Sequence, residues 1–294
     1  MKLQKKQKKL FALLGAGAML IIPAIAFEWP QANVLQDKFY SFFGQKRSDT
    51  LSTSLIFSES EEAVCADKGE ISIIITEHDD GFNWFESSLG TCAVVAHEDS
   101  LLTVYGNLDT DNFNTDLYEH PSVTTGTKLA TTGNSAWQET DSYLEFQIID
   151  TQNQNYINPL ILMPRLGQKH ALTLTNVSLK NKFGKVYDLE TQKNIPSGVY
   201  KIYKSRQDNA VPYKTTLLVN GTESERISYN TIKQKDSELA IEGHNLYSAG
   251  ELYPDDDIML LGELYLPHGK DTISIIVTDF SGKEYSRVFT LNVL

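Results

Sequence analysis

Apolar and polar residues alternate over short stretches along most of the chain, and no long stretch keeps the three-to-four-residue spacing of a helix. Alternation with a period of two, and short apolar runs bounded by turn residues, are typical of β-strands. The clearest pair of runs is Ala93–Ala96 and Leu101–Tyr105, with the polar turn His97–Ser100 between them. This pattern predicts an antiparallel hairpin near the middle of a sheet.

The same pattern predicts an all-β chain in two parts. At 294 residues, the chain can bury two cores, and the polar junction Arg165–His170 separates residues 51–166 from residues 171–294. Asn220-Gly221, directly after an apolar run, predicts a tight hairpin because both central residues take positive φ. About seven strands in the second part favour an immunoglobulin-like sandwich without cysteines. The further strands are expected at Ala63–Ala66, Glu70–Thr76, Tyr143–Ile149, Ala171–Leu179, Gly198–Tyr203, Thr215–Val219, Arg226–Tyr229, Met259–Leu266, Thr272–Thr278 and Arg287–Val293.

The N-terminus, residues 1–26, has the pattern of a signal peptide. Five lysines precede the apolar run Leu10–Ile22, and Ala24-Ile25-Ala26 follows as a small-x-small cleavage pattern. A membrane span needs about 20 apolar residues, so a cleaved signal is favoured over an uncleaved anchor. We therefore expect an exported protein, periplasmic or in the cell envelope, whose mature chain starts at Phe27. Residues 27–50 then form an aromatic lead-in segment.

The net charge of the chain limits its expected binding partners, and its two cysteines limit its possible disulfides. Without the five N-terminal lysines, the formal charge of −12 becomes −17. An acidic surface disfavours nucleic acid and anionic lipid, which leaves an uncleaved anchor as the only expected membrane contact. Cys65 and Cys92 both flank predicted strands. In an exported protein they can form a disulfide, and the alternative is two buried thiols.

The predicted hairpin resembles the core of the lysostaphin-type (LytM) zinc peptidases, which cut peptidoglycan cross-bridges. In that family the same place reads roughly V-x-I-x-H-x-x-G-L-x-T-x-Y-x-H-L, whereas here it closes with Tyr105-Gly106-Asn107-Leu108. Val123–Thr132 resembles a glycine-containing turn of the family, and Asn158-Pro159-Leu160 resembles its closing Asn-Pro. The resemblance spans residues 51–166 and implies a lysostaphin-type β-sheet domain there.

The positions that would carry the zinc chemistry have changed. A catalytic zinc needs three protein ligands and an open position for water. The family takes its ligands from His-x-x-x-Asp and His-x-His motifs. Here Ser52 and Ile56 stand at the first pair, Tyr143 and Glu145 stand at the second, and Asn107 replaces the histidine of Tyr-x-His-Leu. One carboxylate among these residues is not a zinc set, so the resemblance implies neither zinc nor catalytic residues.

Two further residues of the expected groove keep the family's residue types. His97 matches a family histidine that does not coordinate metal, and we expect a hydrogen-bonded structural role for it. Tyr105 lies in the same hairpin. The resemblance therefore implies a non-catalytic envelope protein that binds peptidoglycan or a partner hydrolase, as a scaffold or regulator of cell-wall hydrolysis. The alternatives are an active zinc endopeptidase with a non-standard ligand set, and an adhesion or structural module.

Overall fold

The computed structural model describes residues 27–76, 87–133, 135–136, 143–167 and 170–294, so the expected signal peptide lies outside the described residues. Strands dominate this part of the chain, and its one α-helix is the short α1 (Ala249–Leu252). The prediction of an all-β chain is confirmed. In the described ranges, no helix has the length and apolar character that a membrane crossing requires.

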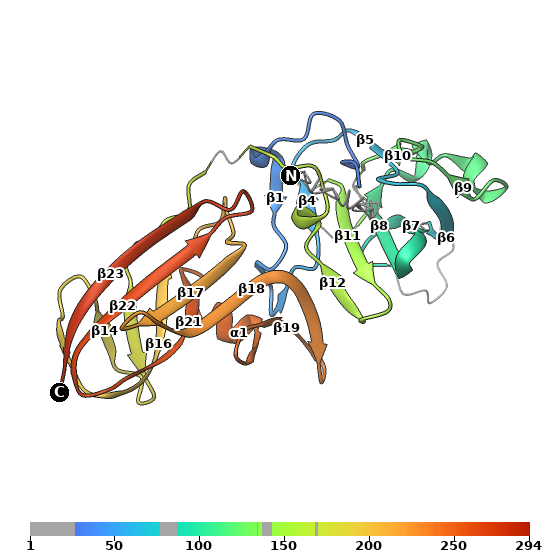
Figure 1. The fold of residues 1–294 in the computed structure, drawn as a ribbon. Helices are drawn as coiled ribbons and strands as arrows, with labels where there is room; N and C mark the ends of the chain where they lie inside the picture. Colours follow the sequence, from blue (N-terminus) through green and yellow to red (C-terminus); the bar gives the residue numbers. More distant parts are fainter. Residues whose placement is uncertain (1–26, 77–86, 134, 137–142, 168–169) are drawn as a thin grey trace, which may run out of the picture.

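The predicted central hairpin is present. β7 (Thr91–Ala96) and β8 (Leu101–Leu108) pair antiparallel, with Ala93 opposite Tyr105. These strands lie in the middle of the lobe on the right of Figure 1. The other strands of this lobe are β1 (Phe39–Ser41), β2 (Lys46–Arg47), β3 (Thr50–Leu51), β4 (Leu55–Phe57), β5 (Glu62–Val64), β6 (Gly69–Ile75), β9 (Ser122–Val123), β10 (Lys128–Thr131), β11 (Glu145–Asp150) and β12 (Asn155–Ile157).

The second lobe is a sandwich of two sheets around one core (Figure 1). One sheet has the order β14-β13-β16-β21, and the other contains β15-β23-β22-β17-β18. Asn220 and Gly221 have φ of 52° and 81° and form the predicted hairpin between β17 and β18. The strands are β13 (Ser178–Asn181), β14 (Val186–Asp188), β15 (Asn194–Ile195), β16 (Gly198–Ser205), β17 (Lys214–Val219), β18 (Thr222–Lys235), β19 (Glu238–Glu242), β20 (Leu246–Ser248), β21 (Ile258–Leu266), β22 (Gly269–Thr278) and β23 (Glu284–Val293).

The expected strand Ala171–Leu179 is wrong for most of its length. The strand starts only at Ser178 and runs to Asn181 as β13. Leu172, Leu174 and Val177 are nevertheless buried in the sandwich core. The alternation of apolar and polar residues here reflects which side chains are buried and does not reflect strand pairing. An irregular segment that crosses a core also points alternate side chains inward.

The long strand β18 joins the two lobes. Its first half pairs with β17 in the sandwich, and its second half pairs with β12, with Ile232 opposite Tyr156. The core cluster that contains Phe57 and Tyr105 also contains Ile232 and Tyr253. The two lobes therefore share both a ladder and a buried apolar core.

The aromatic lead-in packs over the first lobe and reaches the second. Phe39 stacks edge-on against Phe42 and Phe57, with ring centroids 5.4 and 5.2 Å apart. The Tyr253 hydroxyl, on the other lobe, donates to the Gly44 carbonyl at 2.9 Å. This segment therefore fixes the position of Arg47 near the first-lobe sheet and ties it to the sandwich.

The possible disulfide between Cys65 and Cys92 is not formed, because both cysteines are free and buried. Cys65 belongs to the core cluster that includes Ala93, whereas Cys92 does not. Neighbouring residues of a strand point to opposite faces, so Cys92 points away from the face that Ala93 shares with Cys65. Burial raises the pKa of the Cys65 thiol to about 12 and that of Cys92 to about 11. The buried-thiol alternative describes the structure.

Candidate functional site

Three neighbouring strands bring the altered family positions together. Glu145 on β11 lies opposite Ile56 on β4 and, on its other side, opposite Gly106 on β8. Asn107 follows Gly106 directly. Tyr143 lies just before β11, and its backbone N–H donates to the Phe57 carbonyl at 2.8 Å. The sheet register therefore gathers residues that are far apart in sequence at one end of these strands.

Glu145 is the charged centre of this cluster, and its side chain is only 2% exposed. Its Oε1 accepts from Arg47 Nη1 at 2.9 Å, from Ser54 Oγ at 2.8 Å and from Gln147 Nε2 at 3.3 Å. A buried carboxylate is costly unless it is paired and hydrogen-bonded. Here one cation and two neutral donors converge on one oxygen, so the carboxylate is well stabilised without a metal.

Ser52 is linked to Glu145 through Ser54. The Ser52 hydroxyl lies 3.2 Å from the Ser54 carbonyl, to which it donates, and both serines are buried. The Ser54 hydroxyl in turn donates a hydrogen bond to Glu145 Oε1. The sequence position expected for a histidine ligand is therefore occupied by a small side chain that supports the loop before β4.

Asn107 braces the segments around the cluster. It has a φ of 58°, at the register shift where β8 leaves its regular pairing with β7. Its Nδ2 donates to the Tyr143 carbonyl at 2.9 Å, and its Oδ1 accepts from the Ala136 N–H at 3.0 Å. Its backbone N–H donates to the Leu89 carbonyl at 2.6 Å. Asparagine tolerates the left-handed conformation, so this residue both shapes the bulge and holds three segments.

The family's zinc does not fit this donor set. The five positions offer one hydroxyl, one aliphatic chain, one committed amide, one phenol and one carboxylate. The carboxylate already faces the guanidinium of Arg47 at 2.9 Å. Within the described ranges, no three His, Cys, Asp or Glu side chains gather where they could hold a metal ion.

His97 is hydrogen-bonded through both ring nitrogens. Nδ1 lies 2.8 Å from the Lys68 carbonyl, and Nε2 lies 2.7 Å from Thr103 Oγ1. A carbonyl only accepts, so Nδ1 carries a hydrogen and donates it to the Lys68 carbonyl. Thr103 Oγ1 also lies 3.1 Å from the hydroxyl of Tyr105, which accepts from the Ala66 N–H at 2.7 Å. The chain of contacts ties the hairpin to the loop after β5.

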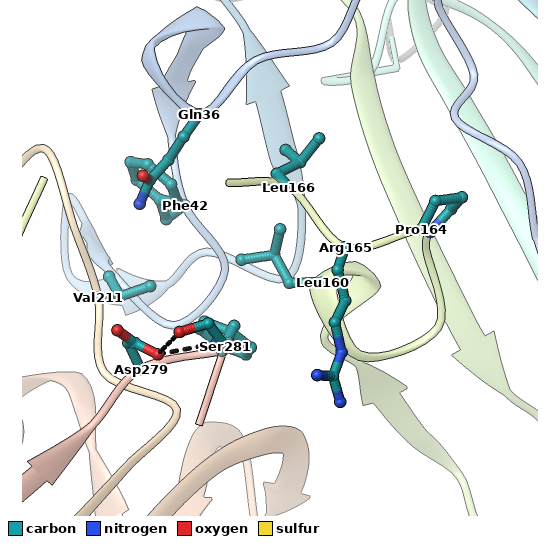
Figure 2. Close-up of a pocket in the computed structure, with 10 residues that line it drawn as sticks. Gln36, Phe42, Leu160, Pro164, Arg165, Leu166, Val211, Asp279 and Ser281 are labelled. Atoms are coloured by element: carbon teal, nitrogen blue, oxygen red, sulfur yellow. Dashed lines mark hydrogen bonds between the residues drawn. The ribbon is translucent and has the colours of Figure 1, made fainter. Parts of the chain in front are cut away.

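A cavity lies at the junction of the lobes, between Phe42, Leu160, Arg165 and Asp279 (Figure 2). Its volume is about 40 Å³, which is room for a few water molecules and not for a larger ligand. Asp279 Oδ1 accepts from the N–H groups of Ser281 and Lys283, at 2.8 and 3.0 Å. This carboxylate therefore shapes the turn between β22 and β23.

Three residues of the cluster were not predicted from the sequence. Arg47, Ser54 and Gln147 all bond to Glu145, but only Gln147 is near it along the chain. Arg47 is 98 residues away. Nothing in the sequence around Arg47 indicates that it pairs with Glu145. Gln147 could have been predicted, because residues two apart on a strand point to the same face.

Comparison with known proteins gives one family match, one curated relative and several solved structures. A protein-family model matches residues 171–294. An uncharacterized protein of Treponema pallidum (strain Nichols) is 30% identical over 143 residues, which cover 46% of this chain and 91% of that protein.

The similar solved structures include a zinc containing peptidase, LytU and lysostaphin. A zinc containing peptidase from Vibrio cholerae is 18% identical at a TM-score of 0.31, over 42% of this chain and 36% of that one, so the chain spans little more than a third of its length. LytU is 20% identical at 0.27, over 38% and 73% of the two chains. Lysostaphin is 14% identical at 0.32, over 87% and 89%. At these TM-scores the similarities carry no conclusion on activity.

Proposed function

We propose that this chain, which belongs to the same family as the uncharacterized Treponema pallidum protein, is an exported cell-envelope protein with a non-catalytic lysostaphin-type domain. In this proposal the first lobe binds peptidoglycan or a partner hydrolase, as a scaffold or regulator of cell-wall hydrolysis. The landmarks that resemble the family lie in that lobe, at the β7–β8 hairpin and at Asn158-Pro159.

One observation is the main support for a non-catalytic domain. The Arg47 guanidinium stands 2.9 Å from the buried Glu145 carboxylate, where the family resemblance would place a metal ligand. The guanidinium has five N–H donors and no accepting atom, so it pairs with the carboxylate but cannot activate water as a Lewis acid. The described residues of this site therefore favour binding of a ligand by hydrogen bonds and charge over hydrolysis.

Tyr143 is the residue through which we expect this site to contact a ligand. Its side chain is partly exposed, whereas Ser52, Ile56, Asn107 and Glu145 are buried. A phenol gives a rigid face and a polar tip at low conformational cost, which suits the recognition of peptide or sugar. The buried residues would then hold Tyr143 in place through the Asn107 amide.

The test is a pair of measurements on isolated peptidoglycan sacculi. The purified chain is incubated with sacculi and zinc, and the released cross-link peptides are measured alongside the protein that sediments with the sacculi. We expect no peptide release, and sedimentation that falls in Tyr143→Ala but not in Tyr118→Ala, a matched change at a tyrosine that is 57% exposed.

A parallel reaction adds an active lysostaphin-type hydrolase, because a regulator would change its rate. Peptide release by the chain alone would overturn the non-catalytic proposal. Absence of both sedimentation and any effect on the added hydrolase would overturn the role in cell-wall hydrolysis.

A further inference from the structure

The outer face of the β14-β13-β16-β21 sheet combines lysines with exposed apolar side chains. Leu179, Tyr200 and Leu264 point into the sandwich core. Residues adjacent to them therefore point outward, since strand side chains alternate between faces. We name the outward residues Lys180, Lys182, Phe183, Val199, Lys201 and Tyr265 the basic–apolar face. Lys182 and Phe183 belong to the turn between β13 and β14.

The lysines of this face lie close together and have few carboxylates near them. Lys180 is directly opposite Lys201 in the ladder between β13 and β16. Like charges directly opposite one another on a sheet destabilise it. Lys201 has Glu263 as its other cross-strand neighbour and lies 3.9 Å from Glu251. In the part of the chain that the structure describes, neither Lys180 nor Lys182 has a carboxylate within ion-pair distance.

The apolar half of the face lies beside these lysines. Val199 is directly opposite Tyr265, and they are 49% and 57% exposed. Phe183, in the adjacent turn, is 82% exposed, and the Lys182 ammonium lies 5.1 Å from its ring centroid. A hollow of about 360 Å³ is lined by Lys180, Lys182, Val199 and Lys201 together with Glu263. Exposed apolar patches of this kind mark interaction surfaces.

We propose that the basic–apolar face binds an acidic segment of a partner protein in an extended conformation. The lysine pair and the Val199–Tyr265 pair are two residues apart along β16, which is about 6.6 Å in a strand. An extended peptide with an acidic and an apolar side chain two residues apart has the same repeat. Its carboxylates neutralise Lys180 and Lys201, and its apolar side chains cover Val199 and Tyr265.

A long polyanion fits this face less well than a short acidic segment. The whole chain has a formal charge of −12, so the surfaces around the face repel an extended phosphate backbone or an anionic membrane. Such ligands also offer no side chain to cover the valine and tyrosine. The combination of few charges and adjacent apolar groups is what selects a peptide.

The test uses fluorescence anisotropy with the full chain and a short labelled peptide of repeated Glu-Ser-Leu-Ser. The double change Lys180→Gln and Lys201→Gln should weaken binding about fivefold to tenfold, the sum expected of two exposed charge pairs. The matched control is Lys235→Gln with Lys270→Gln, the same charge change at exposed positions that are not part of the face, and it should change binding less than about twofold. Tyr265→Ser should also weaken binding, whereas Val288→Ser, at a side chain 61% exposed on β23, should not.

Control ligands make the proposal falsifiable. A peptide with Gln in place of Glu, and one with Ser in place of Leu, should both bind more weakly than the parent peptide. The proposal would be overturned if either control peptide bound as tightly as the parent peptide, or if the parent peptide did not bind. It would also be overturned if the Lys180/Lys201 variant and the Lys235/Lys270 variant lost the same binding affinity. Tighter binding of a single-stranded oligonucleotide or of anionic vesicles would also overturn it, in favour of a general polyanion surface. None of these outcomes depends on the proposed role of the first lobe.

Discussion

Arg47 Nη1 and Glu145 Oε1 lie 2.9 Å apart and join the lead-in hairpin to the central sheet of the first lobe. The two ends of this ion pair differ in exposure, because the Arg47 side chain is 38% exposed and that of Glu145 is 2% exposed. The cost of breaking the pair must therefore depend on which partner is removed. A buried charge that loses its partner cannot be rehydrated, whereas a partly exposed one can.

We predict that Arg47→Met destabilises the fold by about 2–3 kcal/mol and Glu145→Gln by about 1 kcal/mol. The first change leaves a buried carboxylate without the Arg47 guanidinium, and the second leaves a cation that reaches water. The double variant should be more stable than Arg47→Met alone. Urea unfolding of the four proteins gives the coupling energy. Equal costs for the two single changes would contradict the pairing as described.

The contacts of His97 give a second stability prediction. Thr103 is fully buried and lies between His97 Nε2 and the Tyr105 hydroxyl. Thr103→Val keeps the shape but removes a hydrogen-bond partner from both neighbours, which should cost about 1–3 kcal/mol in urea unfolding. Thr290→Val, the same change at an exposed position of β23, should have no measurable effect. Equal effects would show that His97 and Tyr105 find other partners.

Much of the strand arrangement can be predicted from the local pattern of apolar, polar and turn residues. The cluster around Glu145 cannot be predicted in this way. The hairpin of β7 and β8 was predictable because two apolar runs flank one short polar turn, and Asn220-Gly221 fixed its own turn through positive φ. The second half of β18, from Thr231 to Lys235, is polar and was not predicted. It becomes a strand because β12 and β19 pair with it. The ion pair joins residues 98 positions apart, and such a contact depends on the completed fold.

Lys204 on β16 gives a prediction for the pH dependence of stability. It is 2% exposed, its ammonium donates to the Ser205 carbonyl at 2.9 Å, and burial lowers its pKa to about 8. The folded pKa lies below the unfolded value of 10.5, so folding disfavours the charged form. Stability is therefore reduced below about pH 8 and recovers as the pH rises through the window to about 10.5.

Lys204→Met should remove this penalty. Near neutral pH the variant should be more stable than the parent by up to about 3 kcal/mol, and the advantage should shrink as the pH approaches 10.5. Urea unfolding across this range measures the difference, with Lys235→Met as the exposed control. A variant that is less stable than the parent at neutral pH would mean that the ammonium makes a net favourable contact.

The two cysteines give a prediction that separates thiols from a disulfide. Because burial raises the pKa of Cys65 to about 12 and of Cys92 to about 11, both should resist an aromatic disulfide reagent near neutral pH in the folded chain. Both should react after unfolding without reductant. Failure of the unfolded chain to react would mean that a disulfide forms after all.

The same pKa shifts predict a loss of stability at high pH. The folded values lie above the unfolded value of 9.0, so the contribution is fully present below about pH 9 and is lost as the pH rises toward 11 and 12. Cys65→Ala, which has no titrating group there, should show a smaller loss of stability over that window. An equal loss would assign the alkaline transition to other groups.

We propose that the Arg47 guanidinium pairs with Glu145 where the lysostaphin-type peptidases hold a metal. The most direct test is the zinc content of the purified chain after dialysis against a zinc-containing buffer, measured by mass spectrometry of the metal beside that of Glu145→Ala. We predict no stoichiometric zinc in either protein. One zinc per chain in the parent, lost in Glu145→Ala, would show that this carboxylate is a metal ligand and would contradict the account.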